Sequence, residues 1–288
     1  MTRLKLSDRV LESLLDDDVP FGDLTTHVLG IGAKPGRITF AARDRMVVAC
    51  AEEAARLLEL AGARVGTVAE SGAELAPGRA ILEAMGSAEA LHCGWKVAQT
   101  LVEYASGIAT AARRIVEAAR AARPDIPVVC TRKNMPGAKA VAIKAILAGG
   151  ATPHRLGLSE TILIFAEHRA FLDGQSAAEA IDRARRAAPE KKIVVEVSSL
   201  DEALTWAAAG ADVIQTEKFS VDDLSALSLR LTASGYQTLV AAAGGINAIL
   251  APPEGQIPAP WPWLTDILNG GLARGELWLL AARPSIGK

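Results

Sequence analysis

The sequence predicts an α/β protein built around a parallel β-sheet, and three observations lead to this prediction. Half of the 288 residues are hydrophobic but only 4% are aromatic, so Ala, Leu, Val and Ile must fill the core. Aliphatic strands of this kind are typical of parallel sheets that are covered on both faces. From residue 127 onward, short aliphatic runs alternate with helical patterns across short links. This alternation indicates βα units, arranged either as a barrel or as a doubly wound sheet.

Five strand–helix steps make up this central region. Helix boundaries are marked by Pro136 in a first turn, by Ser220 as a cap, and by a capping box of Ser199 with Glu202. We expect strands at 127–131, 161–165, 193–197, 212–217 and 238–242, and helices at 136–147, 176–188, 199–210 and 220–233.

The two ends of the chain differ from the centre. The first hundred residues predict a smaller α+β unit, with helices at 8–17 and 51–61 and strands at 37–40 and 46–50. A long helix from 97 to 122, interrupted at Ser106-Gly107, is expected to follow. Proline and tryptophan are concentrated after residue 250, which marks a boundary. We therefore expect domains at 1–105 and 106–249 and an atypical segment at 250–288.

Composition and charge exclude several classes of protein. A net charge of −2 gives no reason to expect nucleic acid as the main partner. No apolar stretch approaches the roughly 18 residues of a membrane-spanning helix, and the first residues lack the apolar region of a signal peptide. Cys50, Cys93 and Cys130 are isolated, which argues against a zinc site or a disulfide framework. We expect a cytoplasmic protein.

One segment of this slightly acidic chain is strongly basic. Residues 127–169 contain six Lys and Arg residues against only two acidic residues. Arg132 and Lys133 follow one expected strand, and His154 and Arg155 form a second basic pair. A guanidinium group can bind a carboxylate or phosphate with two hydrogen bonds, so this segment predicts an anion site. Glu196 and Glu217 also lie at strand ends, which form the active-site face of a βα-barrel.

Plainer interpretations apply to several of these residues. Lys139 and Lys144, on the helix after Pro136, would reach a phosphate or equally well form a solvated face. His168 is interpreted as structural, and residues 16–18 as an acidic helix end and not a metal site.

Six short motifs follow one another between residues 8 and 247. Each is weakly specific alone, whereas the ordered set is specific. They are Gly22-Asp23-Leu24-Thr25-Thr26, Ser106-Gly107-Ile108-Ala109-Thr110, Thr131-Arg132-Lys133 with Pro136-Gly137, His154-Arg155 with Gly157-Leu158, Glu196-Val197, and Gly244-Gly245-Ile246. The set resembles that of the quinolinate phosphoribosyltransferase (nicotinate-nucleotide pyrophosphorylase) family, and it is most similar to the ModD branch, found with molybdate-transport genes. The resemblance implies an N-terminal α/β sandwich plus an incomplete, open α/β barrel, assembled as a homodimer with sites between subunits.

The resemblance also implies a reaction. The family joins the nitrogen of a carboxylated heterocycle to C1 of phosphoribosyl pyrophosphate and releases pyrophosphate. By resemblance, Arg132, His154 and Arg155 would hold the carboxylates of the acid, and Lys133 would contact the phosphoribosyl donor. Glu196 and Glu217 would hold ribose hydroxyls or Mg²⁺, a cation that favours carboxylate and phosphate oxygens. Gly244 and Gly245 would offer N–H groups to the 5′-phosphate.

Three positions depart from the pattern of quinolinate enzymes. Phe165 stands where those enzymes have a Lys, Lys96 where they have an Arg, and Glu217 where they have an Asp. Losing one cation and weakening another makes a dianionic substrate less suitable. We therefore expect an acceptor other than quinolinate.

The C-terminal segment departs further. Residues 263–288 resemble the opening of a DnaB-like helicase ATPase domain with a broken phosphate loop that includes Gly287-Lys288. We interpret this segment as a fusion or truncation that could impair activity, and not as a second activity. Its run from Glu276 to Ala282 would form a strand that replaces a lost barrel strand. The alternative to an enzyme is a degenerate accessory protein that binds a nucleotide or anion without turnover.

Overall fold

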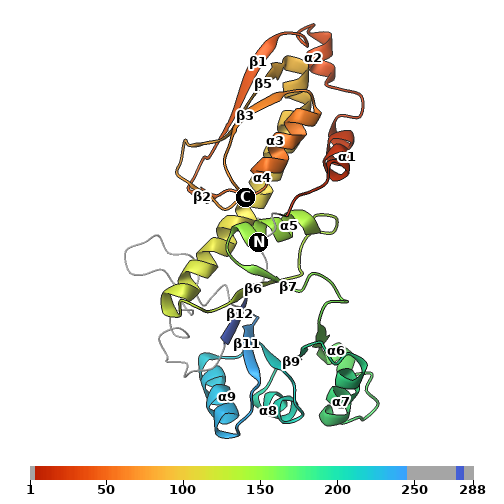
Figure 1. Cartoon of the computed structure of the whole chain (residues 1–288), viewed down its shortest axis with the longest axis vertical. Coiled ribbons are helices and arrows are strands. Elements are labelled where there is room, and N and C mark those ends of the chain that lie inside the picture. The colour runs from red at the N-terminus through yellow and green to blue at the C-terminus, as the bar shows by residue number, and fades with distance from the viewer. Residues whose placement is uncertain (1–3, 245–276, 282–288) are drawn as a thin grey trace. The chain divides into compact units, whose positions relative to one another are not determined.

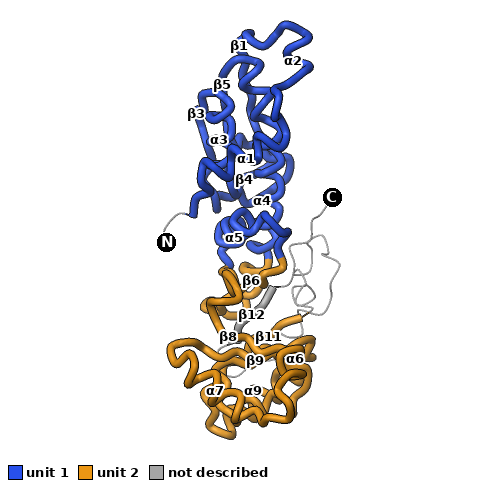
Figure 2. The backbone as a smooth tube through the Cα atoms, turned by 90° about the vertical axis from the view of Figure 1, so that its right-hand side faces the viewer, with its two compact units in different colours: residues 1–114, 134–151, 284–288 blue, residues 115–133, 152–283 orange. Residues whose placement is uncertain are grey.

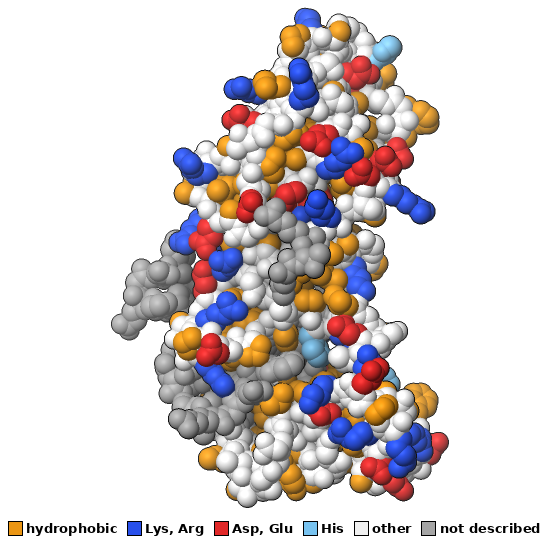
Figure 3. Space-filling view, in the orientation of Figure 1, with side chains coloured by type: hydrophobic (Ala, Val, Ile, Leu, Met, Phe, Trp, Pro, Cys, Tyr) orange, Lys and Arg blue, Asp and Glu red, His pale blue; other side chains and the backbone are white. Residues whose placement is uncertain are grey.

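The structure, a computed structural model, describes residues 4–244 and the backbone of residues 277–281 (Figure 1). Its described residues divide into two compact units (Figure 2). Unit 1 contains residues 4–114 and 134–151, and unit 2 contains residues 115–133, 152–244 and 277–281. On the face seen in Figure 3, acidic and basic side chains of the described residues are intermixed. None of the described helices is long and apolar enough to cross a membrane.

Unit 1 combines an antiparallel sheet with helices. The sheet has the order β1-β5-β3, formed by Pro35–Ala41, Ala80–Ser87 and Arg64–Val68, and β2 (Met46–Val47) pairs separately with β4 (Glu74–Leu75). The core joins β5 to α3 (Ala51–Leu60) and α4 (Ala88–Ala122) through Leu58, Leu82 and Leu91. The smaller helices are α1 (Asp8–Asp18) and α2 (Leu24–Val28). A sheet covered by helices in this way confirms the expected α/β sandwich.

Two sequence predictions in unit 1 are wrong. The strand expected at 46–50 ends at Val47, because Cys50 has a φ of 59° and forms the N-cap of α3. The long helix is not interrupted at Ser106-Gly107. Ser106 is buried, and its hydroxyl accepts a hydrogen bond from the backbone N–H of Ala49 at 3.0 Å. The side chain thus bonds to a neighbouring segment and does not compete with the backbone of its own helix.

Helix α5 (Lys139–Ala148) also belongs to unit 1, although β6 and β7 on either side of it in sequence belong to unit 2. It begins later than predicted, because Gly137 has a φ of +83°, outside the helical region. Its C-terminal end lies close against α4. A Cβ at Gly149 would meet the carbonyl oxygen of Ala109 at 2.6 Å, so only glycine fits there. Arg113 donates hydrogen bonds to the carbonyl oxygens of Ala148 and Gly149.

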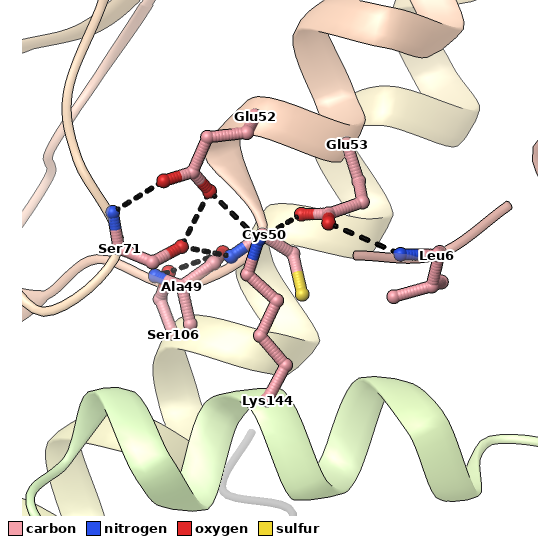
Figure 4. A network of polar contacts seen from close by, with 8 residues as sticks. All are labelled: Leu6, Ala49, Cys50, Glu52, Glu53, Ser71, Ser106 and Lys144. Carbon is pink, nitrogen blue, oxygen red and sulfur yellow. Dashed lines mark hydrogen bonds and ion pairs between the residues drawn. The ribbon is translucent and has the colours of Figure 1, made fainter. Parts of the chain in front are cut away.

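A buried ion network links α5 to α3 (Figure 4). Lys144 is only 9% exposed, and its Nζ donates to Glu52 Oε2 at 3.0 Å and to Glu53 Oε2 at 2.5 Å. Glu52 also accepts hydrogen bonds from the backbone N–H and hydroxyl of Ser71, while Glu53 accepts from the N–H of Leu6. Lys144 therefore neither forms a solvated face nor reaches for phosphate, and both sequence interpretations of this residue are wrong.

Unit 2 is built on a seven-stranded sheet in which every pairing is parallel. The order is β7-β6-β12-β11-β10-β9-β8. Helices α6 to α9 follow the strands, and hydroxyls of Ser176, Ser199 and Ser220 cap three of them. The strands are Val128–Thr131 (β6), Thr152–His154 (β7), Ile162–Ile164 (β8), Ile193–Val197 (β9), Val213–Glu217 (β10), Leu239–Ala243 (β11) and Leu277–Ala281 (β12). The helices are Ala166–Arg169 (α6), Ala177–Ala187 (α7), Leu200–Ala208 (α8) and Val221–Ala233 (α9).

The strand order identifies an open barrel. Each strand from β8 to β11 pairs with the next strand in sequence, and β12 pairs with β6, which pairs with β7. The order around the sheet is thus the order along the chain, with the only break in the described pairings between β7 and β8. A doubly wound sheet would instead reverse its strand order at a switch point. The structure therefore confirms the incomplete α/β barrel.

Strand β12 comes from the atypical C-terminal segment. It lies between β11 and β6 and pairs in parallel with both. The strand expected within 276–282 is therefore present and fills a place inside the sheet. The rest of the helicase-like resemblance, including Gly287-Lys288, lies outside the described residues.

One capping prediction is only half right. The hydroxyl of Ser199 accepts from the N–H of Glu202 at 3.3 Å, as expected. The carboxylate of Glu202, however, accepts from the N–H of Ser198 and from Arg169, and not from Ser199. Arg169, which bonds to the Glu202 carboxylate, also donates to the carbonyl oxygen of Glu196.

Candidate active site at the carboxyl ends of the strands

The parallel strands of unit 2 bring chemically active side chains to one edge. Because all seven strands run the same way, their carboxyl ends lie on the same side of the sheet. Most of the candidate residues lie at those ends: Arg132 and Lys133 after β6, His154 and Arg155 at β7, Glu196 in β9, Glu217 at the end of β10, and Gly244 after β11.

The cations at β6 and β7 are electrostatically close. Arg155 is 7% exposed, and its Nη1 donates to the carbonyl oxygens of Leu158 at 3.4 Å and Thr161 at 2.5 Å. Burial lowers the pKa of Arg155, and the positive charge of Arg132 lowers it further. Burial, followed by the charge of Arg155, also lowers the pKa of His154. Neighbouring positive charges repel one another, and a bound anion would relieve this repulsion.

The carboxylates at β9 and β10 form a second group. Burial raises the pKa of Glu196, and the negative charge of Glu217 raises it further. A hydrogen bond from Gln215 and the charge of Lys133 act in the opposite direction. The structure therefore brings Glu196, Glu217 and Lys133 together, which are three of the residues predicted from the sequence.

Glu196 is held at both its side chain and its backbone. Gln215, its partner in the register of β9 and β10, donates from Nε2 to Glu196 Oε2 at 2.5 Å. Arg169 donates from Nη1 to the carbonyl oxygen of Glu196 at 2.5 Å and from Nη2 to Glu202 at 3.2 Å. Sequence reasoning missed both supporting residues. The signal for Gln215 was an amide in the middle of a strand that begins with the aliphatic residues Val213 and Ile214.

Gly244 lies beside Glu217. Gly244 has a φ of +75°, and a Cβ there would lie 2.6 Å from Glu217 Oε2. The backbone of Gly244 therefore lies directly against this carboxylate. Lys218 Nζ lies 3.8 Å from the other oxygen of Glu217, in an exposed ion pair. Gly245, the second expected phosphate contact, lies outside the described residues.

Two further positions named from the sequence can be placed. Lys96 lies on α4 in unit 1, where its Nζ donates to Gln99 at 3.2 Å and lies 4.3 Å from the ring centroid of Trp95. It is not among the residues gathered at the sheet edge of unit 2. His168 accepts a hydrogen bond from the N–H of Phe165 at 3.0 Å, and the two rings stack 5.3 Å apart. This local bonding agrees with the structural interpretation of His168.

The carboxylate pair is chemically suited to Mg²⁺. The described residues contain no cluster of three or more His, Cys, Asp or Glu side chains. Mg²⁺, however, is usually bound by one or two carboxylates together with substrate phosphates. The charge of Glu217 raises the pKa of Glu196, and a divalent cation would relieve this repulsion. Glu196 and Glu217 thus have the type of donor atom that Mg²⁺ prefers.

Comparisons with known proteins match this arrangement. Two family models cover most of the chain: the N-terminal domain of quinolinate phosphoribosyl transferase over residues 23–106 and its C-terminal domain over residues 108–249. The ModD protein of Rhodobacter capsulatus is 48% identical over 248 residues, which cover 86% of this chain and 95% of that protein. Human nicotinate-nucleotide pyrophosphorylase (carboxylating) is 33% identical, over 83% of this chain and 79% of the human protein.

A solved structure agrees with the fold. NadC from Streptococcus pyogenes superposes with a TM-score of 0.80 at 25% identity, over 98% of this chain and 94% of that chain. Together with the matches in sequence, this likeness settles the relationship. The chain belongs to the quinolinate phosphoribosyl transferase family.

Proposed function

We propose that this protein transfers the phosphoribosyl group of phosphoribosyl pyrophosphate to a carboxylated nitrogen heterocycle and releases pyrophosphate. The observation that carries the proposal is the division of the sheet edge into two groups. Cations gather at β6 and β7, and two carboxylates gather at β9 and β10 beside Lys133. A reaction between two anions that passes through a positively charged sugar needs both groups.

The cationic group suits the anionic parts of the substrates. Arg132 carries a guanidinium group suited to a carboxylate, and His154 lies at the end of β7. Arg155 is buried with its Nη1 bonded to two backbone carbonyl oxygens, so it would contribute its charge and its remaining N–H donors. By resemblance to the family, Lys133 would contact the phosphoribosyl donor. Gly244, with Gly245, would offer backbone N–H groups to the 5′-phosphate. The role of Lys96, which lies in unit 1, stays a prediction from the resemblance.

The carboxylate group suits the sugar. Glu196 and Glu217 would accept hydrogen bonds from ribose hydroxyls, and their charges would stabilise the positive charge that develops at C1 as pyrophosphate leaves. The same pair would hold Mg²⁺, which when bound neutralises charge on the departing pyrophosphate. Holding the heterocycle and the sugar together supplies much of the catalysis by proximity.

The acceptor is proposed to be an acid other than quinolinate. Phe165 follows β8 at the place where quinolinate enzymes have a Lys, and its ring stacks on His168. An apolar ring there offers no charge to a second carboxylate. Efficient turnover of quinolinate by the purified protein would overturn this part of the proposal.

The test of the main proposal is a pyrophosphate-release screen with phosphoribosyl pyrophosphate, Mg²⁺ and a set of pyridine and pyrimidine acids. At least one acid should support release, and the Glu196→Gln variant should lower the rate by about 100-fold. Arg183→Gln, on the exposed face of α7, is the matched control and should leave the rate unchanged. Binding of phosphoribosyl pyrophosphate without release for any acid would favour the accessory-protein alternative.

A homodimer with sites shared between subunits, and a cytoplasmic location, complete the proposal. Both rest on the resemblance to the family and on the composition of the chain. Sedimentation at micromolar concentration would test the dimer directly.

A further inference from the structure

The anomaly in unit 2 is a buried glutamine. β10 reads Val213-Ile214-Gln215-Thr216-Glu217, and its first four residues are all buried. Strands buried on both faces are normally aliphatic. Burying a side-chain amide costs free energy unless its polar atoms find partners. Gln215 is 6% exposed and satisfies only one end of its amide, since Oε1 is buried without a hydrogen-bond partner.

The one partner of Gln215 is a candidate catalytic group. Gln215 and Glu196 are directly paired in the register of β10 and β9, so their side chains point to the same face of the sheet. Nε2 of Gln215 donates to Glu196 Oε2 at 2.5 Å. An ionised carboxylate only accepts hydrogen bonds, so this contact also fixes which end of the amide faces Glu196. Among the described residues, Glu196 Oε1 has no hydrogen-bond partner and stays available to a ligand.

The backbone of Glu196 is held in the same region. Arg169 donates to its carbonyl oxygen, and Arg169 is itself held by Glu202 and lies 5.9 Å from the ring centroid of Trp206. With the backbone held, the position of the Glu196 carboxylate depends on its side-chain torsions. The hydrogen bond from Gln215 restricts them.

We propose that Gln215 is a positioning residue that fixes the carboxylate of Glu196 so that its Oε1 faces the phosphoribosyl donor. This inference rests on the proposed function of the site. Gln215 itself need not touch the substrate and acts through Glu196. The hydrogen bond from Nε2 to the charged carboxylate offsets part of the cost of burying Oε1 of Gln215 without a partner.

The variant to make is Gln215→Met, which keeps the length of the side chain and removes the amide. Thr216→Val is the matched control, because Thr216 is the next residue of the same strand, points to the opposite face and is fully buried. Both variants lose one buried polar group, but only the first loses contact with Glu196. Melting temperatures of both show that the fold is kept, and Gln215→Leu serves as a second variant if the first does not fold.

The first measurement is calorimetric titration with phosphoribosyl pyrophosphate and Mg²⁺. Gln215→Met should weaken binding by about 10- to 100-fold, as loss of a carboxylate-orienting neighbour does in other sites. In a Glu196→Gln background the same substitution should have no further effect, because the group it positions is already gone. An affinity within twofold of the unmodified protein, or an equal loss in both backgrounds, would overturn the inference.

The second measurement does not depend on the proposed function. A crystal structure of Gln215→Met should show the carboxylate of Glu196 in a new rotamer or in two conformers, while the structure of Thr216→Val should not. An unmoved Glu196 in Gln215→Met would overturn the inference. If the unmodified protein does not bind phosphoribosyl pyrophosphate, the proposed function fails, and the crystal structures alone decide the role of Gln215.

Discussion

Replacing Lys144 by Met tests the buried ion network that links α5 to α3. Lys144 Nζ lies 3.0 Å from Glu52 and 2.5 Å from Glu53, and the side chains of Lys144 and Glu53 are only 10% and 4% exposed. Met has a similar length and no charge, so the substitution removes the ion pairs and keeps most of the packing. Glu53 then stays behind as a buried carboxylate whose remaining hydrogen bond comes from Leu6 at 3.4 Å.

The expected loss follows from this geometry. Removing one partner of a buried ion pair costs about 3–5 kcal/mol, because the other charge is left uncompensated. Glu53 determines the loss, since Glu52 is 37% exposed and keeps two hydrogen bonds from Ser71. At roughly 2–4 °C per kcal/mol for a protein of this size, the melting temperature should fall by roughly 6–20 °C.

The assay is thermal unfolding at pH 7, followed by circular dichroism. Arg56→Met, which removes exposed ion pairs with Asp8 and Glu59, is the control and should cause a much smaller shift. Lys144→Met combined with Glu53→Met should recover most of the loss, because apolar side chains can replace a buried ion pair. The reasoning is wrong if Lys144→Met melts within about 2 °C of the unmodified protein, or if the double variant is no more stable than the single one.

Three further predictions concern pH, the site and the C-terminal strand. Burial raises the pKa of Glu52, but hydrogen bonds from Ser71 and Lys144 outweigh it and lower the pKa to about 2. Its ionised form thus stabilises the fold fully above pH 4.5, and this contribution disappears as the pH falls to about 2. Between pH 4.5 and about 2, the melting temperature of Glu52→Gln should fall less steeply with falling pH than that of the unmodified protein. An unchanged slope would contradict this. Gly244→Ala should displace Glu217 and lower pyrophosphate release by up to about 100-fold; unaltered release would show that this carboxylate is not needed. Removing residues 250–288 deletes β12 and should lower the melting temperature, whereas an unaltered value would show that the sheet does not need this strand.

The strands and helices of unit 2 were predictable because their determinants are local. Aliphatic runs such as Ile193–Val197 and caps such as Ser176 and Ser220 appear within a few residues of the elements they define. Because the strands were predicted correctly, the positions of Arg132, Glu196 and Glu217 at strand ends could be predicted as well. β7 was missed because its three residues are too short to show a pattern.

Residues whose partners are distant in sequence were not predictable. Lys144 finds Glu52 at a separation of 92 residues, and nothing near Lys144 distinguishes it from a solvated lysine. Ser106 likewise depends on Ala49, 57 residues away. In each case a polar side chain is satisfied by a segment that the local sequence does not contain. Burial of such groups is decided by tertiary structure, so a periodic pattern cannot reveal it.

The position of β12 explains how an atypical segment can complete a family fold. The match to the C-terminal family model ends at residue 249, yet β11 and β6 both require a neighbour for their backbone N–H and C=O groups. Those groups make no demand on side-chain identity, since ladder hydrogen bonds involve only the backbone. An apolar run of five residues, Leu277–Ala281, is therefore enough to pair with both neighbours. The candidate site residues with charged side chains lie on or next to β6, β7, β9 and β10. The strand that departs most from the family, β12, carries none of them.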